Sequence, residues 1–337
     1  MPQRRRVAVL ASPHPRRRIF TDAVWQQFTA AYDVVDLTDT PDRLDELLPD
    51  LFAIVGQPDL PRARLDHASS LRALLNVEGN FYPNVDYDAC FERGIAVLGC
   101  GPAYADAVAE FALGLALDLA RGISREDRAF RAGRESYVAS GNADAVLLRG
   151  ADIGLIGFGN LGRALLPLLE PFRPSVRVFD PWLPDDVLAR AGTTPTALPD
   201  LLAVSQFVFV LATVTAETEG LLGATEFEAM RDHARVVLVS RAPVVDFDAL
   251  LDRVAAGRIT AAVDVWPDEP MPADHRARGM EGLVVSPHRA GGIPQAFSQI
   301  GAMVLDDLKL IERGLPPVRM QVAARELVGR YRNRPVT

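Results

Sequence analysis

Hydrophobic positions fall in short aliphatic and β-branched runs that alternate with longer segments of helical spacing. Short apolar runs bounded by polar turns are typical of strands buried on both faces of a parallel sheet. The first series comprises Val7–Leu10, Val34–Leu37, Phe52–Val55, Leu71–Val77 and Ile95–Leu98. The second comprises Ile153–Ile156, Val176–Phe179, Phe207–Leu211, Val236–Val239, Ala261–Val265 and Val284–Ser286. The pattern predicts an α/β protein with two parallel sheets and therefore two domains.

Three helices stand out between and after these runs. Tyr104–Arg121 is apolar around most of its circumference, so it must be buried on several sides, and Gly122 ends it. Asp246–Gly257 carries an apolar stripe behind a capping aspartate. Pro294–Arg313 is the last strong helix and ends at Gly314. The Tyr104 helix separates the two strand series.

Composition and charge exclude several classes of protein. The 337 residues are 49% hydrophobic and carry a net charge of −8, which argues against a general nucleic-acid binder. No apolar run is long enough to span a membrane or to form the core of a signal peptide, so we expect a cytoplasmic protein. The two cysteines support neither a disulfide framework nor a metal site. Lys309 is the only lysine and lies far from any motif, which argues against lysine-based chemistry.

A glycine-rich turn follows the run Ile153–Ile156 and opens an amphipathic helix. In this strand–turn–helix context, GxGxxG is typical of a dinucleotide site. The first glycine permits the turn, the second lets the backbone approach the pyrophosphate, and the third allows helix and strand to pack closely. A carboxylate at the end of the next strand accepts hydrogen bonds from a ribose diol and repels a 2′-phosphate. The sequence thus predicts NAD, bound at Gly157, Gly159, Asn160, Leu161, Gly162 and Asp180.

Polar residues at three later strand ends suit one chemistry. Arg241 follows VVLVS, Asp264 and Glu269 lie in DVWPDEP, and His288 ends LVVSPH. Because ligands bind at the carboxyl ends of strands in open α/β sheets, these loops should converge. Arg241 could hold a carboxylate with two hydrogen bonds, and His288 could serve as the acid/base. Glu269 in contact with His288 would favour the imidazolium form. We predict that Arg241, Glu269 and His288 are catalytic in the reduction of a keto acid.

The chain resembles the D-isomer-specific 2-hydroxyacid dehydrogenase family. The resemblance rests on NVDYDACFERGIAVLGCGPAYADAVAEFALGLALDLARGI, GLIGFGNLGR, VFDP, TAETEGLL, SRAPVVDFDALL, AAVDVWPDEP and SPHRAGG. It implies catalytic roles for Arg241, Glu269 and His288, and a contact of Asp264 with the nicotinamide. It also implies that backbone N–H groups near Asn80 and Phe81 contact the substrate carboxylate, and that the product is the D isomer.

The resemblance implies a domain order as well. A substrate domain built from residues 1–99 and 294–337 would surround an inserted NAD-binding domain at 100–293. Both domains would be Rossmann-like or flavodoxin-like, and the Tyr104 helix would bridge them and support a homodimer. The expected partners are a small 2-keto or 2-hydroxy acid and a second copy of the chain, with no metal, nucleic acid or membrane.

One loop departs from the family pattern. Where the family usually has GxGxDNxD, this chain reads Glu78-Gly-Asn-Phe-Tyr-Pro-Asn-Val-Asp86, with Phe81 replacing a glycine and Pro83 an aspartate. The change could reshape the substrate pocket or be a tolerated variant of the loop, so no substrate is transferred. Arg289 could add a positive charge to the site, although we favour a solvated side chain.

Two alternatives to a 2-hydroxyacid dehydrogenase stay open. An NAD(H)-binding sensor or corepressor could use the same fold, although the complete Arg/Glu/His set favours an enzyme. A dehydrogenase of a phosphonate or another small anion is also possible because of the altered loop. Formate is disfavoured, because formate enzymes of this superfamily carry glutamine where this chain has Glu269.

Overall fold

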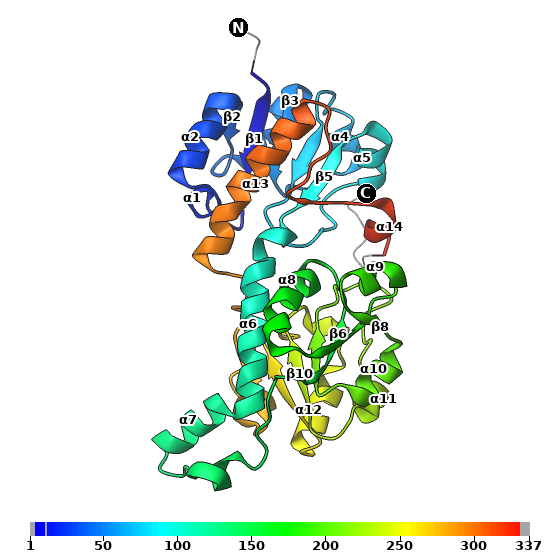
Figure 1. Cartoon of the computed structure of the whole chain (residues 1–337). Coiled ribbons are helices and arrows are strands. Elements are labelled where there is room, and N and C mark those ends of the chain that lie inside the picture. Colours follow the sequence, from blue (N-terminus) through cyan, green and yellow to red (C-terminus); the bar gives the residue numbers. More distant parts are fainter. Residues whose placement is uncertain (1–3, 11, 331–337) are drawn as a thin grey trace. The chain divides into compact units, whose positions relative to one another are not determined.

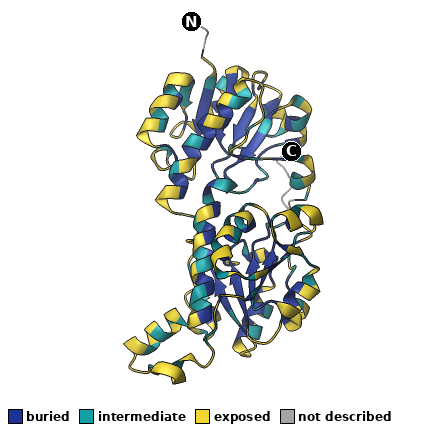
Figure 2. Cartoon of the chain, in the orientation of Figure 1, coloured by how far each residue is buried: buried dark blue, intermediate teal, exposed yellow. Residues whose placement is uncertain are grey.

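The computed structural model describes residues 4–10 and 12–330. Its backbone contacts divide the chain into two compact units, each described here by itself. Unit 1 contains the described residues of Met1–Tyr104 and Gly292–Thr337, and unit 2 is Ala105–Gly291. These divisions lie a few residues from the domain boundaries predicted at 99/100 and 293/294. Buried residues concentrate in the central strands of each unit (Figure 2).

The described residues of unit 1 form a six-stranded sheet with the strand order β13-β5-β4-β3-β1-β2. Its strands are β1 (Arg6–Leu10), β2 (Asp33–Asp36), β3 (Leu51–Gly56), β4 (Ala73–Leu75), β5 (Ala96–Gly99) and β13 (Gln321–Val322). Every pair is parallel except β13 with β5. The crossover between β1 and β3 makes a topological switch point, and the loops after β1 and β3 leave the sheet there.

Helices cover both faces of this sheet because residues alternate between faces along each strand. Val7 and Val9 pack into one apolar cluster with α2 and α13, while Ala8 and Leu10 pack into another with α3, α4 and α5. The helices are α1 (Arg16–Ile19), α2 (Asp22–Ala31), η1 (Pro41–Arg43), α3 (Leu44–Leu47), η2 (Leu48–Asp50), α4 (Arg62–Leu65), α5 (Tyr87–Arg93), α13 (Pro294–Glu312) and α14 (Arg325–Val328). Figure 1 shows α13 lying along the sheet beside α1 and α2.

The described residues of unit 2 form a seven-stranded parallel sheet with the strand order β12-β11-β10-β9-β6-β7-β8. Its strands are β6 (Asp152–Ile156), β7 (Ser175–Phe179), β8 (Thr194–Pro195), β9 (Phe207–Val210), β10 (Ala234–Leu238), β11 (Ile259–Val263) and β12 (Leu283–Val285). The strand order reverses between β6 and β9, which makes the edge above these two strands the expected ligand crevice.

The helices of unit 2 include the buried helix expected near Tyr104. In the structure this helix, α6 (Gly101–Arg121), begins earlier than expected, and the division between the units falls within it. The others are α7 (Ile123–Arg131), η3 (Val138–Asn142), α8 (Asn160–Leu169), η4 (Glu170–Phe172), α9 (Asp185–Arg190), α10 (Leu198–Val204), α11 (Ala224–Ala229), η5 (Ala242–Val244), α12 (Phe247–Ala255) and η6 (Arg276–Gly279). As expected, the side chain of Asp246 caps α12 by accepting from Ala249 N at 3.0 Å. No helix in the described part of the chain is long and apolar enough to cross a membrane.

Candidate active site

The glycine turn joins β6 to α8 at the switch point of unit 2. Gly157 has φ +94°, and a Cβ there would lie 2.8 Å from the Ala212 nitrogen, so only glycine fits. A Cβ at Gly162 would lie 2.9 Å from the Gly157 oxygen. Gly159 differs, because it is exposed and a Cβ there would meet nothing within 4 Å. Packing within the protein therefore explains the first and third glycines, and the second leaves room for a ligand.

This turn fits the pyrophosphate of a dinucleotide. Gly159 is the N-cap of α8 and has no side chain to cap it, while Asn160 and Leu161 form the first turn of the helix. A helix N-terminus of this kind presents backbone N–H groups and the positive end of the helix dipole to an anion. Asp180 lies beside the turn, where its carboxylate accepts from Phe158 N at 2.8 Å and from Trp182 N at 3.0 Å. The predicted cofactor residues from Gly157 to Asp180 thus lie around one turn, whereas Asp264, the remaining one, lies in the loop after β11.

His288 and Glu269 are in direct contact. His288 Nδ1 lies 2.6 Å from Glu269 Oε2, and the two side chains are 42% and 38% exposed. Because Nδ1 is bound to the carboxylate, Nε2 is the ring atom left to exchange a proton with a substrate; no contact to it is seen among the described residues. The contact brings together two residues that are 19 positions apart in the sequence.

Asp264 and Trp266 hold this pair in place. The fully buried Asp264 carboxylate accepts from Arg289 N at 2.8 Å and from Ala290 N at 3.0 Å, and His288 N donates to the backbone oxygen of Asp264 at 2.7 Å. These bonds fix the loop in which His288 adopts φ +51°, an uncommon angle for a residue with a side chain. Trp266 N donates to Glu269 Oε1 at 3.0 Å, and Trp266 Nε1 donates to the Ser286 oxygen at 2.8 Å. Trp266, a residue of the DVWPDEP motif to which no role was assigned from sequence, thus links the loops after β11 and β12.

Arg241 follows β10, the strand next to β11 in the sheet. Its Nη1 donates to the Ser240 oxygen at 2.7 Å, and the residue is half-buried. Arg241, Asp264 and His288 therefore follow the carboxyl ends of three neighbouring parallel strands, where they share one edge of the sheet. Arg289 is exposed, as expected for a solvated side chain.

The remaining predicted substrate residues, Asn80 and Phe81, lie in unit 1, in the loop after β4. The Phe81 ring is 6% exposed and packs into the core, against Gly99 and edge-on to Tyr87 at 6.4 Å between ring centroids. Its bulk is therefore part of the core and does not fill a pocket, which favours the tolerated-variant interpretation for this residue. Asn80 is half-buried.

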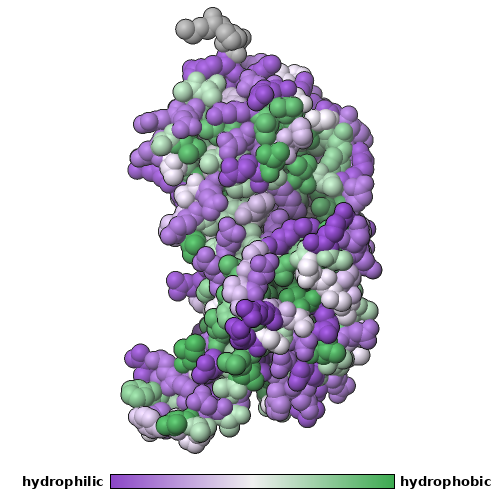
Figure 3. Space-filling model, in the orientation of Figure 1, coloured by the Kyte–Doolittle hydropathy of each residue, from purple (hydrophilic) through white to green (hydrophobic). Residues whose placement is uncertain are grey.

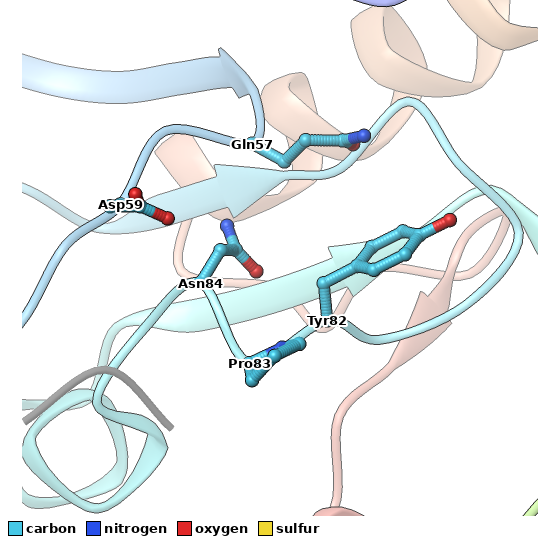
Figure 4. A pocket seen from close by; sticks show the side chains of 5 residues that line it. All are labelled: Gln57, Asp59, Tyr82, Pro83 and Asn84. Carbon is cyan, nitrogen blue, oxygen red and sulfur yellow. The ribbon is translucent and has the colours of Figure 1, made fainter. Parts of the chain in front are cut away.

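The same loop lines a depression of about 320 Å³ in unit 1, formed by Gln57, Asp59, Tyr82, Pro83 and Asn84 (Figure 4). Asn84 Nδ2 donates to the Pro58 oxygen at 3.1 Å, which fixes the orientation of the amide. Buried amide oxygens of Gln57 and Asn84 have no hydrogen-bond partner. Pro83, one of the departures from the family pattern, therefore lines this depression.

Three potentially reactive side chains outside this site belong to the fold. His275 Nδ1 accepts from Ala277 N at 3.2 Å and so caps η6. Cys90 and Cys100 are buried free thiols, and burial raises the pKa of Cys90 to about 12 and that of Cys100 as well, so neither is a ready nucleophile. Within the described ranges, no cluster of histidine, cysteine, aspartate or glutamate could hold a metal ion.

The chain is similar to known proteins in sequence and in fold. Residues 113–290 match the family described as D-isomer specific 2-hydroxyacid dehydrogenase, NAD binding domain. The D-3-phosphoglycerate dehydrogenase of Archaeoglobus fulgidus is 30% identical over 237 residues, which cover 69% of this chain and 44% of that protein. The glyoxylate reductase of Thermofilum pendens is 29% identical over 263 residues, covering 75% of this chain and 76% of that protein. A crystal structure of a phosphoglycerate oxidoreductase from Rhizobium etli is 44% identical, with a TM-score of 0.86 and coverage of 96% of this chain and 99% of that one.

The chain belongs to the D-isomer-specific 2-hydroxyacid dehydrogenase family, and its α/β fold with two parallel-sheet units is that of the family. Residues 113–290 form an NAD-binding domain, so the cofactor predicted from the glycine turn is confirmed. The chain spans about half the length of several D-3-phosphoglycerate dehydrogenases that it matches.

Proposed function

We propose that this protein is an NAD-dependent oxidoreductase that interconverts a small 2-keto acid and its D-2-hydroxy acid. The observation that supports it most directly is the 2.6 Å contact between His288 Nδ1 and Glu269 Oε2. The pair lies at the carboxyl edge of a sheet that also carries the dinucleotide turn. A protein that only binds NAD has no need for a histidine–carboxylate pair at this edge.

Each polar group has one step in the proposed reaction. NADH, when bound, supplies the hydride to the carbonyl carbon. His288 Nε2 donates the proton to the carbonyl oxygen, so that C=O becomes CH–OH, and the Glu269 carboxylate stabilises the protonated ring before the transfer. Arg241 holds the substrate carboxylate with two parallel hydrogen bonds. Backbone N–H groups of Asn80 and Phe81 are proposed as further substrate contacts. Asp264 is proposed to contact the nicotinamide as well as to fix the loop that carries His288.

The test is NADH oxidation at 340 nm with glyoxylate, hydroxypyruvate, 3-phosphohydroxypyruvate, pyruvate, phenylpyruvate and branched 2-keto acids. We expect turnover of at least one of them, with a preference for NADH over NADPH because Asp180 would repel a 2′-phosphate. Tight NADH binding without turnover of any acid would contradict the proposal and favour a sensor, or an enzyme acting on a phosphonate or another small anion.

We propose that the protein acts as a homodimer. Figure 1 shows α7 leading away from the sheet of unit 2, and Figure 3 shows hydrophobic residues on the surface of this projecting segment. The large apolar side chains Ile123, Phe130, Tyr137, Val138 and Leu147 are between 59% and 83% exposed. An apolar surface of this kind in a water-soluble enzyme favours burial by a second copy of the chain.

The dimer prediction is tested by changing this surface. Phe130→Glu places a charge on the exposed face of α7, where the Phe130 side chain contributes nothing to the core, so we expect a shift from dimer to monomer with little loss of thermal stability of the monomer. Light scattering coupled to size exclusion measures the mass, and Arg128→Glu on the same helix controls for the added charge. An unchanged mass for Phe130→Glu, or a monomeric wild type, would rule out this interface.

We further propose a cytoplasmic location. Both cysteines are buried free thiols, which agrees with a reducing compartment.

A further inference from the structure

A second histidine–carboxylate pair lies in unit 1, formed by His14 and Glu78. His14 Nε2 is 2.8 Å from Glu78 Oε1, and the side chains are only 15% and 22% exposed. His14 lies in the loop after β1. Glu78 lies in the loop after β4 and is the first residue of the segment that departs from the family pattern. Both loops leave the carboxyl edge of the sheet, where open α/β folds bind ligands. Nothing in the proposed chemistry uses this pair.

Aromatic packing holds both partners of the pair. The His14 ring lies 4.6 Å from the ring of Phe297, which is 9% exposed and meets the Tyr104 ring edge-on at 5.8 Å. Tyr104 in turn packs beneath Gly79, where a Cβ would lie 3.4 Å from its ring. The backbone oxygen of Glu78 accepts from Cys100 N at 3.1 Å. The backbone and the side chain at the start of the loop are therefore both anchored.

The negative charge of Glu78 explains why its side chain should be held in place. Glu78 lies two residues before Asn80 and three before Phe81, whose N–H groups are assigned to the substrate carboxylate. A free carboxylate beside an anion-binding loop would repel the substrate, and the repulsion is strong where water is partly excluded. An imidazole that donates to Glu78 offsets its charge and turns it away from solvent. Arg18 stacks on Phe297 at 5.1 Å, and among the described residues no contact between Arg18 and Glu78 is seen.

We propose that His14 is a positioning residue for substrate binding: it holds Glu78 so that the Glu78–Tyr82 loop can accept the carboxylate of a 2-keto acid. This inference rests on the proposed function. His14 touches neither substrate nor cofactor in this account, so its loss should weaken substrate binding and leave the chemical step in place.

The experiment compares His14→Ala with three further variants and one control, with the 2-keto acid that the wild type reduces best as substrate. His14→Ala should raise KM by about tenfold or more, because the Glu78 carboxylate is left unpaired, while kcat stays within about threefold. His14→Gln, whose amide can still donate to Glu78, should keep most of the affinity. Glu78→Gln should raise KM less than His14→Ala does, and the double variant His14→Ala/Glu78→Gln should recover most of the lost affinity. His67→Ala, an exposed histidine in the same unit, is the matched control.

The outcomes separate this inference from the function on which it depends. An increase in KM that Glu78→Gln reverses supports the inference, since a merely structural role would lower thermal stability without this rescue. An unchanged KM in His14→Ala, or an equal loss in the single and double variants, would overturn it while the wild type remains active. A wild type that reduces no 2-keto acid but binds NADH would overturn the proposed function, and this inference with it.

Discussion

Replacing His288 by alanine should lower kcat for keto-acid reduction by about a hundredfold to ten-thousandfold, which is the usual contribution of a positioned acid/base. The His288 side chain contacts Glu269 through Nδ1, and this contact leaves Nε2 to give up the proton. NADH affinity should stay within about threefold of wild type, because the dinucleotide turn lies after a different strand. Stopped-flow absorbance at 340 nm and a fluorescence titration with NADH measure the two quantities.

Two further variants make this result specific. Glu269→Gln keeps the size of the side chain but removes the charge that stabilises the protonated ring, so we expect a smaller loss of kcat than in His288→Ala. His275→Ala is the matched control: His275 lies six residues after Glu269 and caps η6, so its removal should leave kcat within about threefold. Comparable losses in His288→Ala and His275→Ala would show that the alanine acts by disturbing the loop, and the acid/base role would fail.

The strands could be predicted because buried parallel strands are almost continuously apolar. Each predicted run overlaps a strand, although the ends often differ by a residue and Leu71–Val77 narrows to β4 at Ala73–Leu75. The pattern missed β8 and β13, which have two residues each and lie at sheet edges, where hydrophobicity does not mark a strand. The antiparallel pairing of β13 with β5 joins residues more than 220 positions apart, and no local signal specifies it.

Part of the candidate site could likewise be predicted from the sequence, and part could not. Glu269 and His288 could be paired from sequence because neighbouring parallel strands deliver their loops to one edge. The position of the Phe81 ring could not be predicted, because it depends on the absence of a side chain at Gly99, a residue in another strand. His14 gave no signal either, since its partner lies 64 residues away and the two loops meet only when β1 and β4 share a sheet.

Adding one methyl group at Gly159 should raise the Kd for NADH by about tenfold or more while leaving the folding stability almost unchanged. Gly159 is exposed, its φ of −76° lies outside the left-handed region that favours glycine, and a Cβ there would meet no protein atom within 4 Å. The methyl group of Gly159→Ala therefore costs the empty protein little, but it occupies the space through which the pyrophosphate approaches the N-terminus of α8. A fluorescence titration gives the Kd, and urea unfolding gives the stability.

Gly157→Ala is the matched control, because it adds the same methyl group two residues earlier. Here φ is +94° and the new Cβ would lie 2.8 Å from the Ala212 nitrogen, so backbone strain and overlap should destabilise the fold by about 1–3 kcal/mol. The two variants should thus differ in kind: Gly159→Ala binds NADH weakly and unfolds like wild type, whereas Gly157→Ala unfolds at lower urea. If Gly159→Ala binds NADH as wild type does, the pyrophosphate does not approach at this glycine. If it unfolds as readily as Gly157→Ala, the turn needs glycine at both positions for folding, and the empty space beside Gly159 cannot be assigned to a ligand.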